Sequence, residues 1–217
     1  MSLSPLIVAA QTAHTATVIW LHGLNNSSAG FAYLPEELGD HFPYVKWVLP
    51  DAPFRDMTFA GGFPMRAWFD VGTKDEDRKG MLESVETVNS LVRNETKHGI
   101  DSDRVVVGGF SQGCVISLLS GLRLEHKLAG IVGYSGWVAL KNETEKAASE
   151  ANKNTPFLIA HGTEDPVVQY KLAKESVKEL RALNYTVTFK TYQGLKHEVS
   201  SDEVKLLAQF LKKVIPP

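Results

Sequence analysis

Short apolar segments alternate with helical patterns along most of the chain, and this alternation limits the possible folds more than any other feature. The segment at residues 104–110 is the clearest case, because after Arg104 it contains only valines, glycines and Phe110. A continuous apolar run of this kind is typical of a strand buried on both faces of a parallel sheet. Further strands are predicted at residues 15–21, 45–50, 130–135, 156–162 and 186–192.

Helical patterns occupy the stretches between these strands. In residues 81–98 the apolar side chains recur at helical spacing, as on one face of an amphipathic helix. Other helices are predicted at residues 112–122, 168–183 and 201–214. The alternation predicts an α/β fold with a mostly parallel central sheet and helices on both faces, formed by residues 1–217 as one domain. Residues 54–66 are expected to form a loop, and residues 141–154 a polar surface segment.

Charge balance and cysteine content exclude several classes of function. The 217 residues include 23 basic and 25 acidic side chains, so the chain has no electrostatic footprint for nucleic acid or an anionic membrane. Cys114 is the only cysteine, which excludes an internal disulfide and a cysteine-built zinc site. No histidine and carboxylate set has the spacing of metal ligands, and no glycine-rich nucleotide motif occurs. We therefore predict neither a metal nor a cofactor.

We expect neither a membrane-spanning segment nor a secretion signal. No apolar stretch approaches the roughly 20 residues that span a bilayer. The N-terminal segment has a short apolar run and no basic region, so it is a poor signal peptide. We expect a cytoplasmic protein, with the nucleus as a further location, and no stable membrane insertion. The sequence does not indicate an oligomeric state.

A candidate nucleophile follows the clearest strand. Residues 109–113, Gly-Phe-Ser-Gln-Gly, match the pattern G-x-S-x-G. This pattern forms a sharp turn from strand to helix that exposes the Oγ atom of the serine, here Ser111. The apolar helix expected after it would point its positive N-terminal end at a developing oxyanion. The alternative is a glycine-rich turn in which Ser111 only caps a helix.

The order of residues suggests a base and an acid for this serine. In proteins with the nucleophile turn described above, the serine precedes the acid and the acid precedes the histidine. Of the histidines after Ser111, His197 is favoured because it lies in the loop that follows the last strand, although alone it would be read as an exposed loop residue. Glu164 and Asp165 follow the preceding strand, and Pro166 favours Asp165 because it fixes the turn. Alternatively, the two carboxylates only line a helix N-terminus, where the helix dipole favours negative charge.

Five segments in chain order resemble the acyl-protein thioesterase family, in the small-carboxylesterase or lysophospholipase-like branch of the α/β hydrolases. They are Leu21–Leu24, Pro50–Pro53, Ala67–Asp70, Gly108–Gly113 and His161–Val168. The resemblance implies the α/β-hydrolase fold and a catalytic triad of Ser111, Asp165 and His197. It also implies an oxyanion hole formed by the backbone N–H groups of Leu24 and Gln112, in agreement with the donors that such turns use.

The chain departs from the family pattern at three places. Residues 25–28, Asn-Asn-Ser-Ser, replace a glycine-rich pair at the rim of the oxyanion loop. Residues 1–3 lack the acylated cysteine of vertebrate members. Residues 58–65 differ from the methionine-rich loop that covers the acyl channel in the family. In this segment we place Phe63 and Met65 at the substrate.

Three other aromatic residues and one histidine can be assigned structural roles in place of roles at the site. Trp137 could form a wall of the site or pack in the core. Trp68 and Phe69 are expected in the core, and His22 is expected to bond loop backbone.

The sequence thus predicts a serine hydrolase that cleaves acyl thioesters and esters through an acyl-serine, with S-acylated proteins as substrates and palmitoyl as the acyl group. A small-ester carboxylesterase or a lysophospholipase is the alternative within this class. A non-catalytic α/β-hydrolase-like scaffold for binding a ligand or partner is the alternative from another class.

Overall fold

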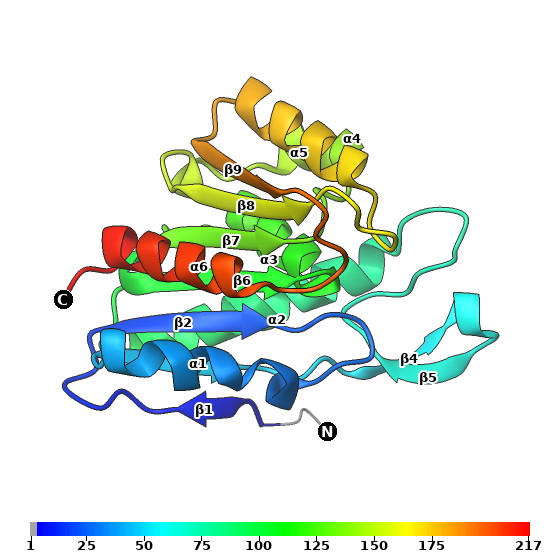
Figure 1. Cartoon of the computed structure of the whole chain (residues 1–217). Helices are drawn as coiled ribbons and strands as arrows, with labels where there is room; N and C mark the ends of the chain where they lie inside the picture. The colour runs from blue at the N-terminus through cyan, green and yellow to red at the C-terminus, as the bar shows by residue number, and fades with distance from the viewer. Residues whose placement is uncertain (1–3) are drawn as a thin grey trace.

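The computed structural model describes residues 4–217, and within this range seven strands form one central sheet (Figure 1). Their order across the sheet is β1-β3-β2-β6-β7-β8-β9. All neighbouring strands are parallel except the antiparallel pair β1 and β3. The strands are β1 (Leu6–Val8), β2 (Ala16–Leu21), β3 (Val45–Leu49), β6 (Val105–Phe110), β7 (Gly130–Tyr134), β8 (Phe157–Gly162) and β9 (Val187–Tyr192). The predicted mostly parallel α/β sheet is confirmed.

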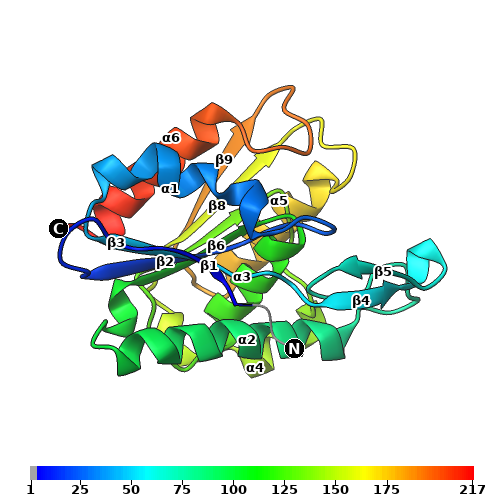
Figure 2. The same ribbon diagram turned by 90° about the horizontal axis from the view of Figure 1, so that it is seen from below.

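Helices cover both faces of the sheet, and each face has its own apolar cluster (Figure 2). On β2, Ile19 and Leu21 belong to one cluster while Val18 and Trp20 belong to the other. This split follows from the strand geometry, in which successive side chains point to opposite faces. One face carries α2 (Arg78–Lys97), α3 (Gln112–Arg123), α4 (Lys141–Ala147) and α5 (Tyr170–Ala182), and the other carries α1 (Tyr33–Leu38) and α6 (Ser201–Val214).

The prediction of a loop at residues 54–66 is wrong. Strands β4 (Phe54–Met57) and β5 (Phe63–Arg66) form an antiparallel hairpin that projects from the body of the molecule. Gly61 and Gly62 adopt φ angles of 64° and 88° in its turn, a conformation that glycine adopts without steric penalty. The two strands pair only with each other, and Met57 is the only one of their residues that is buried. Their sequence therefore lacks the buried apolar alternation by which strands are recognised.

The segment at residues 141–154 is mostly at the surface, but it also contains α4 and two buried polar residues. Thr144 and Asn152 are buried, and the Asn152 side chain accepts a hydrogen bond from the Leu128 N–H. Strand β1 and helix α1 have no counterpart among the predicted elements, because each is too short to show a period. No helix within residues 4–217 is long and apolar enough to cross a membrane. The expectation based on residues 1–3 lies outside the described residues.

Candidate active site

Ser111 occupies a strained turn between the buried strand β6 and the helix α3. Its φ angle is 57°, which is uncommon for a residue with a side chain. The turn requires glycine on both sides. A Cβ at Gly109 would lie 2.5 Å from the Gly113 backbone, and one at Gly113 would lie 2.2 Å from the Leu21 carbonyl oxygen. The backbone N–H of Ser111 donates to the Tyr134 carbonyl at 2.9 Å, which ties the turn to β7.

Three loops at the carboxyl end of the sheet bring Ser111, His197 and Asp165 together. His197 Nε2 lies 2.9 Å from Ser111 Oγ, and His197 Nδ1 lies 2.7 Å from Asp165 Oδ2. The loops follow β6, β9 and β8, at the edge where ligands bind in open α/β sheets. This arrangement can draw a proton from the serine hydroxyl to the imidazole and hold the resulting cation beside a carboxylate.

The backbone holds the Asp165 carboxylate from the side opposite His197. Asp165 Oδ1 accepts hydrogen bonds from the N–H groups of Val167 and Val168, each at 2.8 Å. The Asp165 side chain is fully buried, whereas Glu164 is exposed. Of the two acids that the sequence offered, the structure brings only Asp165 to His197.

His161 supports the same loop, a role that no sequence pattern indicated. His161 Nε2 donates to the Val168 carbonyl at 2.8 Å and lies 3.4 Å from Asp165 Oδ2. Burial lowers the pKa of His161, which keeps the imidazole neutral beside Asp165. A neutral His161 leaves the carboxylate charge available to His197.

A cavity of about 420 Å³ opens in front of Ser111 and His197. Leu24, Gln112 and Trp137, which were predicted from the sequence, line it. The other lining residues are Gly23, Asn26, Val71, Phe110, Val167 and Val168. The lining is mostly apolar, which suits an acyl chain.

The hairpin residues Phe63 and Met65 lie on β5 and are not among the lining residues, and Phe63 is 64% exposed. The hairpin nevertheless reaches the cavity wall at its tip, where the Phe59 N–H donates to the carbonyl of the lining residue Val71. The substrate contact of Phe63 and Met65 stays a prediction.

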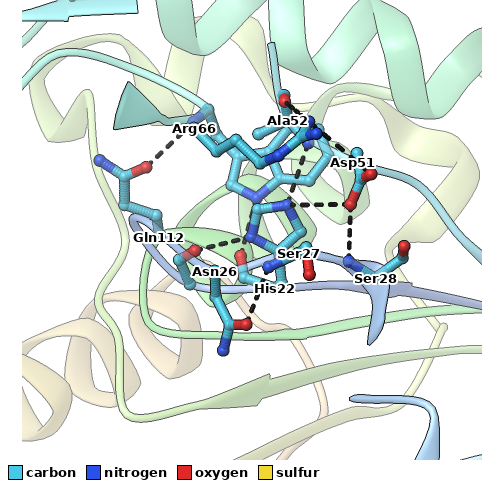
Figure 3. Close-up of polar contacts among 10 residues, drawn as sticks. His22, Asn26, Ser27, Ser28, Asp51, Ala52, Arg66 and Gln112 are labelled. Atoms are coloured by element: carbon cyan, nitrogen blue, oxygen red, sulfur yellow. Dashed lines mark hydrogen bonds and ion pairs between the residues drawn. The ribbon is translucent and has the colours of Figure 1, made fainter. Parts of the chain in front are cut away.

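The loop after β2 carries Leu24, and His22 fixes the backbone at its start (Figure 3). His22 Nδ1 donates to the Gly23 carbonyl at 2.6 Å, and His22 Nε2 accepts from the Ala52 N–H at 3.0 Å. Burial lowers the pKa of His22, in keeping with this neutral form. His22 therefore bonds loop backbone, as the sequence indicated.

Gln112 joins the nucleophile turn to residues 68 and 69. Its side chain accepts from the Trp68 N–H at 3.0 Å and donates to the Phe69 carbonyl at 2.9 Å. Both aromatic side chains are buried, as expected. The backbone N–H of Gln112 belongs to the first turn of α3, where N–H groups have no partner within the helix and can bind an oxyanion.

Among the described residues no group of three or more histidine, cysteine, aspartate or glutamate side chains could hold a metal ion. The prediction that the protein needs no metal stays a prediction.

A sheet of this topology with a serine, a histidine and an aspartate in hydrogen-bonded series defines an α/β hydrolase of the serine hydrolase class. The chain belongs to the phospholipase/carboxylesterase family, whose model matches residues 3–215. It is 37% identical to acyl-protein thioesterase 1 of Yarrowia lipolytica, covering 96% of each chain. It is also 37% identical to acyl-protein thioesterase 1 of Schizosaccharomyces pombe, covering 98% of this chain and 97% of that one. The crystal structure of Zea mays acyl-protein thioesterase 2 superimposes with a TM-score of 0.87 at 31% identity, over 97% of this chain and 98% of the other.

Proposed function

We propose that the protein hydrolyses acyl thioesters and esters through an acyl-serine, with Ser111 as nucleophile, His197 as base and Asp165 as the orienting acid. The observation that carries this proposal is the unbroken series from Ser111 Oγ through the His197 imidazole to Asp165, at 2.9 Å and 2.7 Å. The series opens onto a cavity with mostly apolar walls.

The first half of the reaction forms the acyl-enzyme. Ser111 Oγ attacks the acyl carbonyl carbon while His197 Nε2 takes the hydroxyl proton. The negative charge that develops on the carbonyl oxygen is bound by the N–H groups of Leu24 and Gln112, and each such donor typically contributes about 3–4 kcal/mol. The bond to the leaving group then breaks, and His197 returns the proton to the departing sulfur or oxygen.

The second half of the reaction releases the acid. His197, again neutral, takes a proton from water, and the resulting hydroxide attacks the acyl carbonyl on Ser111. The tetrahedral intermediate collapses with cleavage of its bond to Ser111 Oγ, and the protonated His197 returns the proton to that oxygen, so the enzyme is restored. Asp165 keeps Nδ1 of His197 protonated throughout, so Nε2 is the atom that exchanges protons in both halves.

We propose S-acylated proteins, and palmitoylated ones in particular, as the substrates. The names of the thioesterase relatives support this choice, and so does the apolar wall beside Ser111. The family description also includes phospholipases and carboxylesterases, so a lysophospholipid or a small ester is the alternative substrate. A cytoplasmic or nuclear location stays a prediction that accords with the single, buried Cys114.

Two experiments test the proposal. A fluorophosphonate probe should label the wild-type protein on Ser111 and leave the Ser111→Ala variant unlabelled, whereas an unlabelled wild type would indicate a non-catalytic binding scaffold. The second compares kcat/KM for an S-palmitoylated peptide, a lysophosphatidylcholine and short oxygen esters. The peptide should be hydrolysed with the highest kcat/KM. A higher value for the lysophospholipid or the short esters would contradict the substrate assignment and leave the triad assignment standing.

A further inference from the structure

The loop that carries Leu24 is bound at two points by residues far from it in the sequence (Figure 3). The Asn25 N–H, directly after Leu24, donates to the Arg66 carbonyl at 2.8 Å. The Ser28 N–H donates to Asp51 Oδ1 at 2.6 Å. Asn25 has a φ angle of 56°, so the chain turns sharply here and depends on outside contacts to keep one conformation.

Arg66 and Asp51 are themselves connected, which closes a ring of contacts around the loop. Arg66 Nη1 donates to the Ala52 carbonyl at 3.2 Å and lies 3.7 Å from Asp51 Oδ2. Both side chains are largely buried, with exposed fractions of 22% and 15%. An ion pair that is shielded in this way is screened less by salt than a surface pair.

Arg66 is also the last residue of β5, so the ring joins the hairpin to the loop that carries Leu24. The carbonyl of Arg66 can hold Asn25 in place only while the end of β5 stays fixed. The guanidinium of the same residue helps to fix it, through Ala52 and Asp51, beside the hydrogen bond from the Ala67 N–H to the Pro53 carbonyl at 3.0 Å. The Arg66 guanidinium also lies over the Phe54 ring at 4.8 Å, which adds a contact to β4.

We propose that Asp51 and Arg66 are positioning residues that hold the Leu24 N–H in the geometry needed to bind the oxyanion. This inference rests on the proposed function. Neither side chain touches the reacting atoms, and neither lines the cavity in front of Ser111. They act by keeping the backbone of residues 24–28 from rotating, and an oxyanion donor displaced by about 1 Å loses much of its effect on the rate.

The chain offers a matched control in the same hairpin. Arg55, on β4, donates to the Ala67 carbonyl and to Glu83 on α2, each at 3.1 Å. Arg55 thus anchors the hairpin to the body without a side-chain contact to residues 24–28 or to Asp51. Arg55→Gln and Arg66→Gln each remove one guanidinium from the hairpin and keep the backbone acceptors.

The first test measures kcat and KM for a short oxygen ester, together with the inhibition constant of a short alkyl trifluoromethyl ketone. The ketone forms a tetrahedral adduct on the serine whose oxyanion needs the Leu24 N–H. We expect Arg66→Gln and Asp51→Asn each to lower kcat roughly tenfold and to raise the inhibition constant of the ketone by a similar factor. KM should stay within about twofold of the wild-type value. Arg55→Gln should change each value by less than about twofold.

The double variant Asp51→Asn/Arg66→Gln shows whether the two residues act as one unit. If they do, kcat in the double variant falls no further than in the single variants, because each change already opens the ring. Multiplied effects in the double variant would overturn the proposal. So would equal losses in Arg55→Gln and Arg66→Gln, which would show that any hairpin anchor has the same influence.

Amide hydrogen exchange provides a readout that does not depend on turnover. The amides of Asn25 and Ser28 should exchange faster in Arg66→Gln than in the wild type, and at the wild-type rate in Arg55→Gln. Unchanged exchange at both amides in Arg66→Gln would overturn the proposal. If the wild type is neither labelled by a fluorophosphonate nor active on any ester, the proposed function fails, and the exchange rates still decide whether Asp51 and Arg66 hold this loop.

Discussion

The loops around Ser111 and the hairpin of β4 and β5 are built in opposite ways. Ser111, His197 and Asp165 lie on loops that leave the central sheet, and both Ser111 and Asp165 are more than 90% buried. The hairpin of β4 and β5 projects from the body (Figure 2). Its residues Phe54, Phe59 and Phe63 are among the most exposed large apolar side chains of the described residues.

We expect this difference to separate the part that performs the proposed chemistry from the part that contacts the substrate. Around Ser111, many backbone contacts fix one conformation, so the reacting atoms need no adjustment when substrate binds. The hairpin pairs only with itself and leaves apolar surface open, which suits contact with substrates of different length. The predictions below test whether chemistry and recognition divide along this line.

Removal of the nucleophile should have the largest effect. Ser111→Ala is expected to lower kcat by roughly 10⁶-fold on every substrate, because no other group in the cavity can form the acyl intermediate. The melting temperature should stay close to that of the wild type, since within residues 4–217 the Ser111 hydroxyl is hydrogen-bonded to His197 alone. Measurement of kcat and thermal unfolding on the same preparation checks both points. Substantial turnover by a folded Ser111→Ala protein would place the chemistry elsewhere.

Replacement of the orienting acid should have the next largest effect. Asp165→Asn is expected to lower kcat by roughly 10⁴-fold. The amide oxygen can keep the bonds from Val167 and Val168, which leaves the amide NH₂ facing His197. That donor favours the tautomer with the proton on Nε2, which cannot accept a proton from Ser111.

Glu164→Gln is the matched control for this prediction, because Glu164 is adjacent and exposed. Its kcat should stay within about twofold of the wild-type value. A loss in Glu164→Gln comparable to that in Asp165→Asn would show that the wrong carboxylate has been assigned.

The strands of the central sheet and the chain order of the candidate triad could be predicted from the sequence. The side-chain contacts that hold the loops could not. The strand predicted at residues 186–192 is observed at Val187–Tyr192, because β-branched residues reveal such strands directly. The chain order of serine, acid and histidine selected residues that lie side by side in the structure. Leu24, which lines the cavity, was identified through the family resemblance and not through a sequence pattern.

The hairpin, the support of Asp165 by His161, and the link between Asp51 and Arg66 were not predicted. The last two depend on side chains that meet only after folding and have no fixed spacing. The hairpin lacks the buried alternation that marks a strand, since Met57 is the only buried residue of its two strands. Sequence periodicity reports burial, and it therefore fails where structure forms without burial.

The hairpin should affect long acyl chains and spare short ones. We expect a substrate that extends beyond the cavity to reach the hairpin, where Phe63 and Met65 offer apolar surface. Each buried methylene contributes up to about 0.8 kcal/mol, so four carbons could raise kcat/KM by about two orders of magnitude. The double variant Phe63→Ala/Met65→Ala should flatten the rise of kcat/KM with chain length and leave short esters nearly unchanged.

A plot of kcat/KM against acyl length, for the wild type and the double variant, measures this directly. Trp137→Ala serves as the comparison on the cavity wall, and it should change kcat/KM for short chains as well, because Trp137 lines the cavity itself. Parallel curves for the wild type and the double variant would show that substrates never reach the hairpin, and that recognition resides entirely in the cavity.

The smallest effect is expected from replacement of a buried acid in α6, the helix that follows His197, and it concerns stability. Glu203 is fully buried in the first turn of α6, where its Oε2 accepts from the Ser200 N–H at 2.8 Å, while Oε1 has no hydrogen-bond partner in the described part of the chain. Burial raises the pKa of Glu203. The native state therefore binds more protons than the unfolded state between the two pKa values, and stability falls as pH rises through that window.

Glu203→Gln keeps an oxygen for the Ser200 N–H and removes the buried charge. The variant should be more stable than the wild type at pH 7, by about 2 °C in Tm if the penalty is near 1 kcal/mol. The gain should vanish as pH falls below 4.5, the ordinary pKa of the group, because Glu203 is then protonated in both states. Asp202→Asn, in the same helical turn but 67% exposed, should show no such pH-dependent gain. An equal gain in Tm at pH 4 and pH 7 would show that the variant is stabilised by packing, and that the charge of Glu203 does not destabilise the wild type.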